Sequence, residues 1–239
     1  MTLSDRMVLV TGATGGLGPV VVRTFAEAGA RLGLVGRDGG RLAHVAATAA
    51  LADDRWAPGV GNVTDPDAAA AAIDQVVAKL GPVDVLLHLV GGYEAGGRIE
   101  SFNDDELRSM LNQHLWSTLH VARRVVPGMV ERGWGRVLAV SATTATTTPP
   151  GLGAYSVAKA AEEALLRTVG REVAGTGVTV NVLVVRKIDT EHERDTAPSP
   201  RNAQWTTPEE LASAMRDLCS DDASATTGQR ITMDKRGVE

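Results

Sequence analysis

Short apolar segments alternate with segments of helical spacing along almost the whole chain. Strands are expected at residues 7–11, 31–35, 84–90, 136–141, 178–185 and 229–233. Helices are expected at residues 17–28, 104–132, 154–174 and 208–219, with a bend or break in the second near Pro127 and Gly128. Apolar strands that are separated by helices are typical of a parallel sheet covered on both faces. The pattern therefore predicts an α/β fold that binds ligands beyond the carboxyl ends of its strands.

A glycine-rich turn follows the first predicted strand. It reads Thr11-Gly12-Ala13-Thr14-Gly15-Gly16-Leu17-Gly18, with the spacing Gly-x-x-x-Gly-x-Gly. Gly12 and Gly16 permit a tight reversal and a close approach of the backbone, and Gly18 lets the next helix lie close to the sheet. The N–H groups at the start of that helix would face a pyrophosphate. The order of strand, turn and helix predicts a dinucleotide site.

A tyrosine and a lysine lie four residues apart in the segment Tyr155-Ser156-Val157-Ala158-Lys159. Residues with this spacing share one face of a helix. Downstream of the glycine turn, in a chain of 239 residues, the pair resembles the short-chain dehydrogenase/reductase family. The resemblance implies a single-domain Rossmann fold over residues 1–239. In that fold, a doubly wound parallel sheet of about seven strands has helices on both faces.

The resemblance also implies an activity: NAD(P)-dependent reduction of a carbonyl or oxidation of an alcohol by hydride transfer. Tyr155 would be the acid and base, donating a proton during reduction and accepting it during oxidation. Lys159 would lower the pKa of the Tyr155 phenol and hold the nicotinamide ribose. The substrate would be a small molecule, and the short polar segment at about 189–206 would be the substrate loop.

The cofactor contacts that the family pattern implies run along most of the chain. They are Gly12, Thr14, Gly15, Gly16, Leu17, Gly18, Arg37, Asn62, Val63, Val90, Gly91, Tyr155, Lys159, Ile188 and Thr190. Where the family has an acidic residue for the adenosine ribose, this chain has Gly36, followed by Arg37. A guanidinium pairs well with a 2′-phosphate. We therefore favour NADP(H) over NAD(H); the alternative is that Arg37 is one of several surface arginines.

Two catalytic positions of the family are changed. The serine expected thirteen residues before Tyr155 is Ala142. A shift or bulge at the strand end would bring Ser141 or Thr143 into its place, or a threonine at the loop start, Thr143 or Thr144, would supply the hydroxyl. The asparagine of the central helix, which supports a proton-relay water, is His114. Its ring either bonds that water or is satisfied locally.

Two further family motifs are replaced. The usual Asn-Asn-Ala-Gly is His88-Leu89-Val90-Gly91, and the usual Pro-Gly after the sixth strand is Val185-Arg186. Arg186 and its neighbour Lys187 either attract an acidic substrate or are exposed loop charges. These departures leave two alternatives to the redox enzyme. One is a non-redox isomerase, dehydratase or cyclase on the same scaffold, and the other is a catalytically degenerate nucleotide-binding protein.

The composition of the chain limits which binding partners and which cellular compartment are expected. The net charge of −5 does not favour nucleic acid or an anionic membrane. The apolar runs are too short to span a bilayer. The single cysteine, Cys219, is expected in the core, and a chain without disulfides suits the cytoplasm. No metal site is expected. By analogy with the family, a homotetramer or homodimer is expected to form through the two long central helices.

Overall fold

Seven parallel strands form one sheet in the computed structural model, which describes residues 3–233. The strands are β1 (Met7–Thr11), β2 (Arg31–Gly36), β3 (Trp56–Val60), β4 (Val85–His88), β5 (Gly135–Ala142), β6 (Val178–Val185) and β7 (Arg230–Thr232). Their order in the sheet is β3-β2-β1-β4-β5-β6-β7. The predicted doubly wound α/β fold is thereby confirmed. The order reverses between β1 and β4, which is where such sheets open a crevice.

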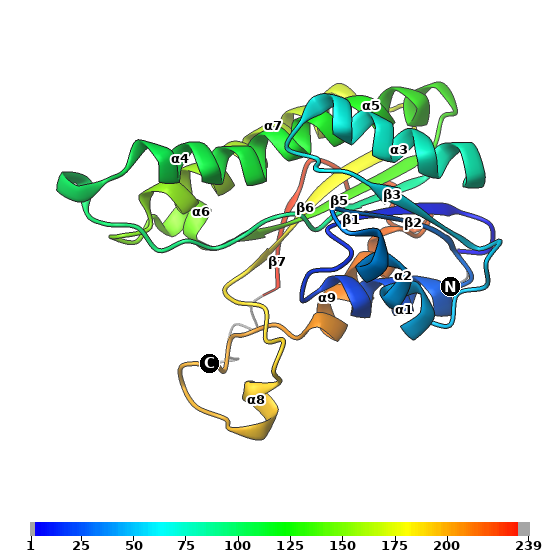
Figure 1. Ribbon diagram of the computed structural model, residues 1–239. Coiled ribbons are helices and arrows are strands. Elements are labelled where there is room, and N and C mark those ends of the chain that lie inside the picture. The colour runs from blue at the N-terminus through cyan, green and yellow to red at the C-terminus, as the bar shows by residue number, and fades with distance from the viewer. Residues whose placement is uncertain (1–2, 234–239) are drawn as a thin grey trace.

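Helices cover both faces of the sheet (Figure 1). One layer contains α1 (Gly18–Glu27), α2 (Gly39–Thr48) and α9 (Pro208–Leu218), and the other α3 (Pro66–Leu80), α5 (Ser117–Glu131) and α7 (Gly153–Glu172). Successive strand residues point to opposite faces. On β1, Val8 and Val10 therefore join the core under α1, whereas Met7 and Leu9 join the core under α3 and α5. Burial on both faces explains why the strands are apolar almost throughout.

The long central helix is interrupted earlier than predicted. Residues 104–132 form α4 (Asp104–Leu111), a π-helical turn η2 (Asn112–Trp116) and α5. Pro127 lies inside α5, so the expected break near it is wrong. Hydroxyls bond back to the carbonyls of the π turn, from Ser117 to Gln113 at 2.6 Å and from Thr118 to His114 at 2.6 Å. Such side-chain bonds satisfy carbonyls that the wider turn leaves free.

Several elements are not predicted by the sequence pattern. They are α2, β3, α3 and the short helices η1 (Ile99–Ser101), α6 (Thr144–Thr147) and α8 (Glu193–Thr196). β3 contains Pro58 and Gly59, which read as a turn, but it is the edge strand of the sheet, where proline is tolerated. β4 ends at His88, two residues earlier than expected, which leaves the following residues free to line a cavity.

Two other observations bear on the expected class of protein. Cys219 is buried, and burial raises the pKa of its thiol to about 12, so it is a core residue. Within residues 3–233, the helices are all too short or too polar to cross a membrane.

Candidate active site

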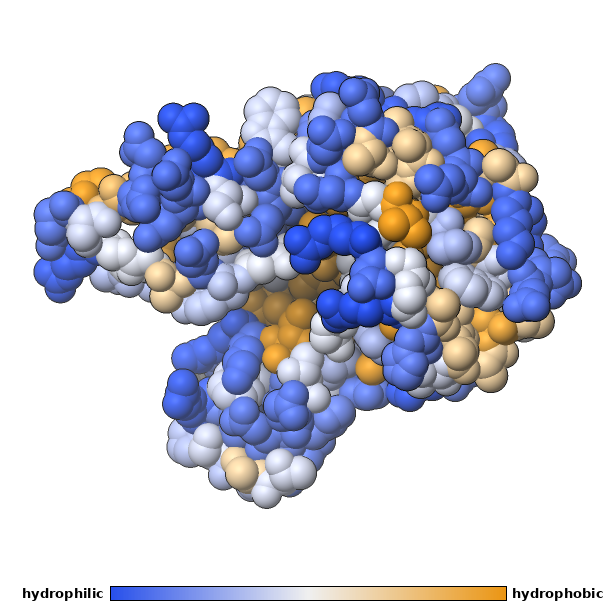
Figure 2. All heavy atoms as spheres, in the orientation of Figure 1, coloured by the Kyte–Doolittle hydropathy of each residue, from blue (hydrophilic) through white to orange (hydrophobic). Residues whose placement is uncertain are grey.

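Two adjoining cavities open beyond the carboxyl ends of the strands. The β2-side cavity has a volume of about 580 Å³ and the β5-side cavity about 1170 Å³. The residues that line both are Gly12, Gly15, Leu89, Val90 and Gly91, from the segments after β1 and β4. Figure 2 shows a hollow with an apolar floor between the projecting α4–α6 end and the lobe that carries α8. Every site residue predicted from the sequence lines one of the two cavities.

The predicted residues divide between the cavities by strand. Thr14, Arg37, Asn62 and Val63 line the β2-side cavity. The β5-side cavity is lined by Gly16, Leu17, Gly18, His114, Ser141, Thr143, Tyr155, Lys159, Ile188 and Thr190. The topology thus brings the glycine turn and the Tyr155–Lys159 pair, which are far apart in the sequence, into one continuous crevice.

The glycine turn is closed too tightly for side chains at two positions. Gly12 has a φ of +74°, and a Cβ there would lie 2.8 Å from the carbonyl carbon of Leu89. A Cβ on Gly18 would lie 2.1 Å from the backbone oxygen of Ala13. A Cβ on Gly16 would meet only the side chain of Thr190, at 3.0 Å. Gly12 and Gly18 therefore set the shape of the turn, whereas Gly16 keeps the turn clear of the segment after β6.

Helix α1 presents an uncapped N-terminus at this turn. The N-cap residue Leu17 makes no capping hydrogen bond, and the first turn contains no acidic side chain. Pro19 lies in that first turn, where its missing N–H costs little. The positive end of the helix dipole, which no side chain caps, suits an anionic group such as a pyrophosphate.

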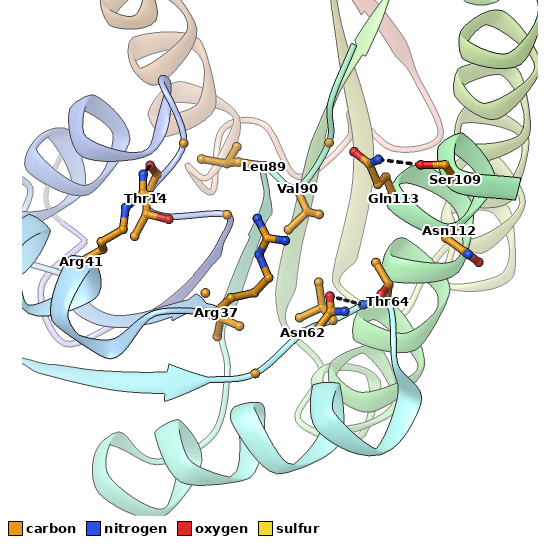
Figure 3. Close-up of a pocket in the computed structure, with 17 residues that line it drawn as sticks. Thr14, Arg37, Arg41, Asn62, Thr64, Leu89, Val90, Ser109, Asn112 and Gln113 are labelled. Carbon is orange, nitrogen blue, oxygen red and sulfur yellow. Dashed lines mark hydrogen bonds between the residues drawn. The ribbon is translucent and has the colours of Figure 1, made fainter. Parts of the chain in front are cut away.

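The β2-side cavity is positively charged. Arg37 and Arg41 line it, and no carboxylate is found among the described residues of its wall. Arg41 donates a hydrogen bond to the Thr14 carbonyl at 3.0 Å, whereas the Arg37 guanidinium extends into the cavity (Figure 3). The neighbouring carboxylate of Asp38 is engaged as the N-cap of α2, accepting from the Arg41 N–H. This arrangement leaves Arg37 positioned for an anionic group.

Tyr155 and Lys159 lie one turn apart on α7. The Lys159 Nζ donates to the Val140 carbonyl and to Glu162 Oε2, both at 2.8 Å. The Tyr155 ring packs edge-on against Tyr93 and His114, with ring centroids 5.3 and 5.6 Å apart. Two features needed for acid–base chemistry, a phenol and an ammonium, therefore share one wall of the β5-side cavity.

The expectation that Lys159 lowers the pKa of Tyr155 is wrong for this site. Burial, and then the charge of Glu162 and the nearby Tyr93, raise the pKa of the phenol to about 12. The Lys159 ammonium, which donates to the buried carboxyl of Glu162 at 2.8 Å, does not offset these causes. Sequence reasoning missed Glu162. The available signal was its spacing, since Ala158 and Leu166, four residues either side, are apolar and buried.

Two buried histidines stand behind the Tyr155–Lys159 pair. His114 lies in η2 with its Nε2 3.0 Å from the Gly92 carbonyl, so one ring nitrogen is satisfied locally. Its Nδ1 has no hydrogen-bond partner among the described residues and lies 3.8 Å from Glu162 Oε2. His88 bridges Thr11 and Ser117, at 2.8 and 3.2 Å. Burial, reinforced by Lys159, lowers the pKa of each histidine to about 3, so both are neutral.

Ala142, which stands where the family has its serine, lies in regular strand geometry. The pairing of β5 with β6 runs without a bulge to Ala142 opposite Val185. No slip therefore brings Ser141 or Thr143 into the place of Ala142, and that expectation is wrong. The hydroxyls of Ser141 and Thr144 are buried without a partner among the described residues, and both residues line the β5-side cavity with Thr143.

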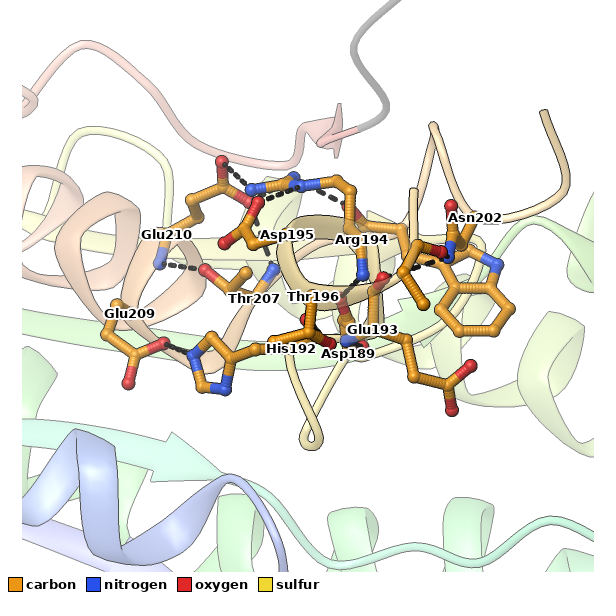
Figure 4. A network of polar contacts seen from close by, with 12 residues as sticks. Asp189, His192, Glu193, Arg194, Asp195, Thr196, Asn202, Thr207, Glu209 and Glu210 are labelled. Atoms are coloured by element: carbon orange, nitrogen blue, oxygen red, sulfur yellow. Dashed lines mark hydrogen bonds and ion pairs between the residues drawn. The ribbon is translucent and has the colours of Figure 1, made fainter. Parts of the chain in front are cut away.

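The segment after β6 is held by its own polar network (Figure 4). The Asp189 carboxylate accepts from the N–H groups of Glu193 and Arg194, each at 2.9 Å. The Arg194 guanidinium forms two bonds with Glu210, at 2.9 and 3.0 Å. Asn202 bonds back to the Glu193 carbonyl. The predicted loop at 189–206 therefore contains the short helix α8 and is anchored to α9.

Charges next to this segment also tie it to the site. Arg186 donates to Gln204 at 2.9 Å, and the Lys187 ammonium lies 3.5 Å from the centre of the Trp205 ring. All four residues line the β5-side cavity. Arg186 and Lys187 are exposed, as one of the two expectations had it, and they also border this cavity. Within residues 3–233, no group of three or more His, Cys, Asp or Glu residues is arranged to hold a metal ion.

Comparisons with known proteins agree with this geometry. The family model described as short chain dehydrogenase matches residues 6–200. The 3-oxoacyl-(acyl-carrier-protein) reductases FabG of Salmonella typhimurium and Thermotoga maritima are 28% and 29% identical to this chain. They cover 97% and 98% of it, and the matches span 96% and 98% of the relatives.

Solved structures give the same result. A short-chain type dehydrogenase/reductase from Mycobacterium ulcerans has a TM-score of 0.85 and 28% identity, covering 97% of this chain and 89% of its own. An NAD+-bound xylitol dehydrogenase superposes with a TM-score of 0.87 over 98% of this chain and 99% of its own, at 21% identity. The second likeness concerns the fold alone.

Proposed function

The chain belongs to the short chain dehydrogenase family, and from this we propose that it is an NADP(H)-dependent oxidoreductase. It reduces a small-molecule carbonyl, or oxidises the corresponding alcohol, by hydride transfer, with Tyr155 as acid and base. The observation that carries the proposal is that Tyr155, Lys159 and the glycine turn line one cavity. The names of the two FabG relatives, which are reductases of a 3-oxoacyl group, support the carbonyl reaction.

The shape and charge of the crevice fit a phosphorylated dinucleotide. The close approach at Gly12 and Gly18 and the uncapped N-terminus of α1 suit the pyrophosphate. Arg37, with no carboxylate beside it among the described residues of the cavity wall, suits a 2′-phosphate and supports NADP(H) over NAD(H). Asn62 and Val63 would contact the adenine, and Val90, Gly91, Ile188 and Thr190 the nicotinamide side.

The bound nucleotide would supply the hydride. Tyr155 would donate its phenol proton to the carbonyl oxygen, and Lys159 would use its remaining N–H to orient the groups around the phenol. A hydroxyl at the start of the following loop, from Thr143 or Thr144, would donate to the same oxygen and so replace the family serine. His114 is neutral, and its Nδ1 has no hydrogen-bond partner among the described residues. This nitrogen would accept a hydrogen bond from a proton-relay water.

Two variants test the proposal and serve as controls for each other. Tyr155→Phe should abolish carbonyl reduction and leave the affinity for NADPH within a few-fold, because the phenol oxygen acts on the substrate. Arg37→Ser should weaken NADPH binding about tenfold or more and leave NADH binding unchanged, because only the 2′-phosphate loses a partner. Calorimetric titration with both nucleotides and a spectrophotometric carbonyl screen measure the two effects.

Opposite results would overturn the assignments. Full activity of Tyr155→Phe would remove Tyr155 from the mechanism. Equal binding of NADPH and NADH by the wild-type protein would remove Arg37 as the group that selects the cofactor. Absence of binding of either nucleotide would contradict the oxidoreductase assignment.

A further inference from the structure

Basic side chains line the β5-side cavity, and no acidic one does within the part of the chain that the structure describes. The basic residues are Lys159, Arg186, Lys187 and Arg201. The protein as a whole has the opposite bias, with 29 acidic and 24 basic side chains and a net charge of −5. A cleft whose walls carry charge of one sign raises the local concentration of ligands of the other sign. The cavity therefore attracts anions.

The two segments that carry the exposed cations are joined by backbone hydrogen bonds. The Asp189 N–H donates to the Thr206 carbonyl at 2.8 Å, and the Thr206 N–H donates to the Lys187 carbonyl at 3.0 Å. This pairing lays the chain just after β6 beside the chain just before α9. Arg186 and Arg201, which are 15 positions apart in the sequence, thereby contribute to the wall of the same cavity.

The neighbour of Arg201 fixes the backbone that carries it. Asn202 is buried, and its amide donates to the Glu193 and Ala197 carbonyls at 3.1 and 2.9 Å. Its Oδ1 accepts from the Ser199 N–H at 2.8 Å. The Arg201 backbone is therefore ordered before a ligand arrives, which lowers the entropy cost of binding.

The two arginines have donors left for a ligand. Arg201 is exposed and forms no hydrogen bond or ion pair with the described residues. Arg186 uses one donor, to Gln204 at 2.9 Å. Lys187 is less available, because its ammonium already faces the Glu193 carboxylate at 3.9 Å. A guanidinium binds a carboxylate or a phosphate through two parallel hydrogen bonds.

The arginines lie on the substrate side of the crevice. Gly12 and Gly15, from the turn that would hold the pyrophosphate, line both cavities. Arg186 and Arg201 line only the β5-side cavity, which also contains Tyr155. An anion bound by the arginines would therefore share a cavity with the reacting phenol, away from the junction of the two cavities.

We propose that the substrate is an anionic carbonyl compound, a small molecule with a carboxylate or a phosphate besides its carbonyl, and that Arg186 and Arg201 bind the anionic group. This inference rests on the proposed function. In reduction, the carbonyl carbon receives the hydride, the carbonyl oxygen receives the Tyr155 proton, and the nucleotide leaves in its oxidised form. The anionic group keeps all its bonds, and its binding directs the carbonyl toward Tyr155. The product is the corresponding hydroxy acid or phosphorylated alcohol.

Matched pairs of substrates test the proposal. Short-chain oxo acids are compared with their methyl esters, and glyceraldehyde 3-phosphate with glyceraldehyde, at saturating NADPH. In one of the two sets, kcat/KM should be about tenfold or more higher for the anion, because the neutral partner loses charged hydrogen bonds. The set that shows the preference identifies the group as carboxylate or phosphate. The KM of the anion should rise with ionic strength, since salt screens exposed charges.

Arginine variants locate the effect. Arg186→Gln and Arg201→Gln should each lower kcat/KM for the anion about tenfold, bring the ratio of anion to neutral partner toward one, and keep the affinity for NADPH. Arg171→Gln is the matched control, because Arg171 is exposed in the last turn of α7 and lines neither cavity. Equal kcat/KM values in both sets, an equal loss for anion and neutral partner, or loss of the preference in the control would overturn the proposal.

Binding without turnover separates this inference from the proposed function. The same oxo acids and glyceraldehyde 3-phosphate are titrated calorimetrically into the protein, with and without NADP+. An anion that binds the wild type but not the Arg186→Gln, Arg201→Gln double variant, without reduction of any carbonyl, would refute the proposed function and leave the anion site standing. Reduction of neutral and anionic carbonyls alike would refute the anion site and leave the oxidoreductase standing.

Discussion

At the scale of single residues, burial decides the protonation of the groups around the site. His88 is enclosed between β1, β4 and α5, with both ring nitrogens bonded. Its pKa is lowered from an ordinary value of 6.5 to about 3, chiefly by burial. The unfolded chain therefore binds more protons than the folded one between these values. The free energy of unfolding therefore has its full value, as far as His88 is concerned, above pH 6.5. It decreases as the pH falls from 6.5 toward 3.

We therefore predict that the folded protein loses stability in mild acid. The free energy of unfolding should fall by about 2 kcal/mol per buried histidine between pH 6.5 and 5. His88→Asn should remove about half of the effect that His88 and His114 produce together. Urea unfolding at pH 7 and pH 5 measures it. His44→Asn, at an exposed position of α2, is the control, and an identical pH dependence in wild type and His88→Asn would contradict the account.

Local spacing was enough to find some site residues and not others. Tyr155, Lys159 and the glycines follow from short motifs, and the structure brings them into one crevice. The contact of Glu162 depends on which face of α7 is buried against α5, a tertiary fact that the motif does not contain. The expected effect of Lys159 on the pKa of Tyr155 was wrong because burial of the phenol, and then the charge of Glu162, raise that pKa, and the motif shows neither.

At the scale of elements, the glycine turn and helix α1 form one closely packed unit. A Cβ on Gly18 would overlap the backbone oxygen of Ala13, which no side-chain movement can relieve. Gly18→Ala should therefore lift α1 from the turn, destabilise the protein by about 1–3 kcal/mol and weaken nucleotide binding.

Thermal unfolding and calorimetric titration check this prediction. Gly128→Ala is the matched control, because it also lies in a helix, but an added Cβ meets only the end of the flexible Arg132 side chain. The control should be neutral or slightly stabilising, since alanine favours helix. Tight NADPH binding by a stable Gly18→Ala protein would contradict the proposed fit.

Boundaries were harder to predict than the elements themselves. The strand at 178–185 agrees with β6 because its apolar run is bounded by polar residues and glycine. The π turn at 112–116 was missed, because it depends on side-chain hydroxyls bonding back to the helix rather than on apolar spacing. The network around Arg194 was missed because its partner Glu210 belongs to the next helix.

At the scale of the whole molecule, the alternation of strands and helices predicted the fold, because both faces of a parallel sheet must be covered. The edge strand β3 escaped prediction because an edge tolerates proline and glycine. The oligomer remains a prediction, and the helical layer that contains α7 and η2 is where we expect the contact. Trp116 and Val157 on these elements are 45% and 49% exposed, which is high for large apolar side chains.

Assembly through this layer is the corresponding prediction. The wild-type protein should sediment as a dimer or tetramer, and Trp116→Glu should shift it toward the monomer, because a charge would be buried at the interface. Val60→Glu, at a comparably exposed apolar residue on the opposite edge of the sheet, should leave the mass unchanged. A monomeric wild-type protein in analytical ultracentrifugation would refute the expectation.

The contact between the glycine turn and the segment after β4 has a consequence for the order of folding. Gly12 rests against the backbone of Leu89, and the adjoining residues Thr11 and His88, which are 77 positions apart, are joined by a hydrogen bond. The crevice between them comes into being only when β4 docks beside β1, so a nascent chain that ends before β4 lacks Leu89, Val90 and Gly91, which line both cavities. Acquisition of nucleotide binding during refolding thus marks the moment at which the two halves of the sheet join, and bound nucleotide resists their separation.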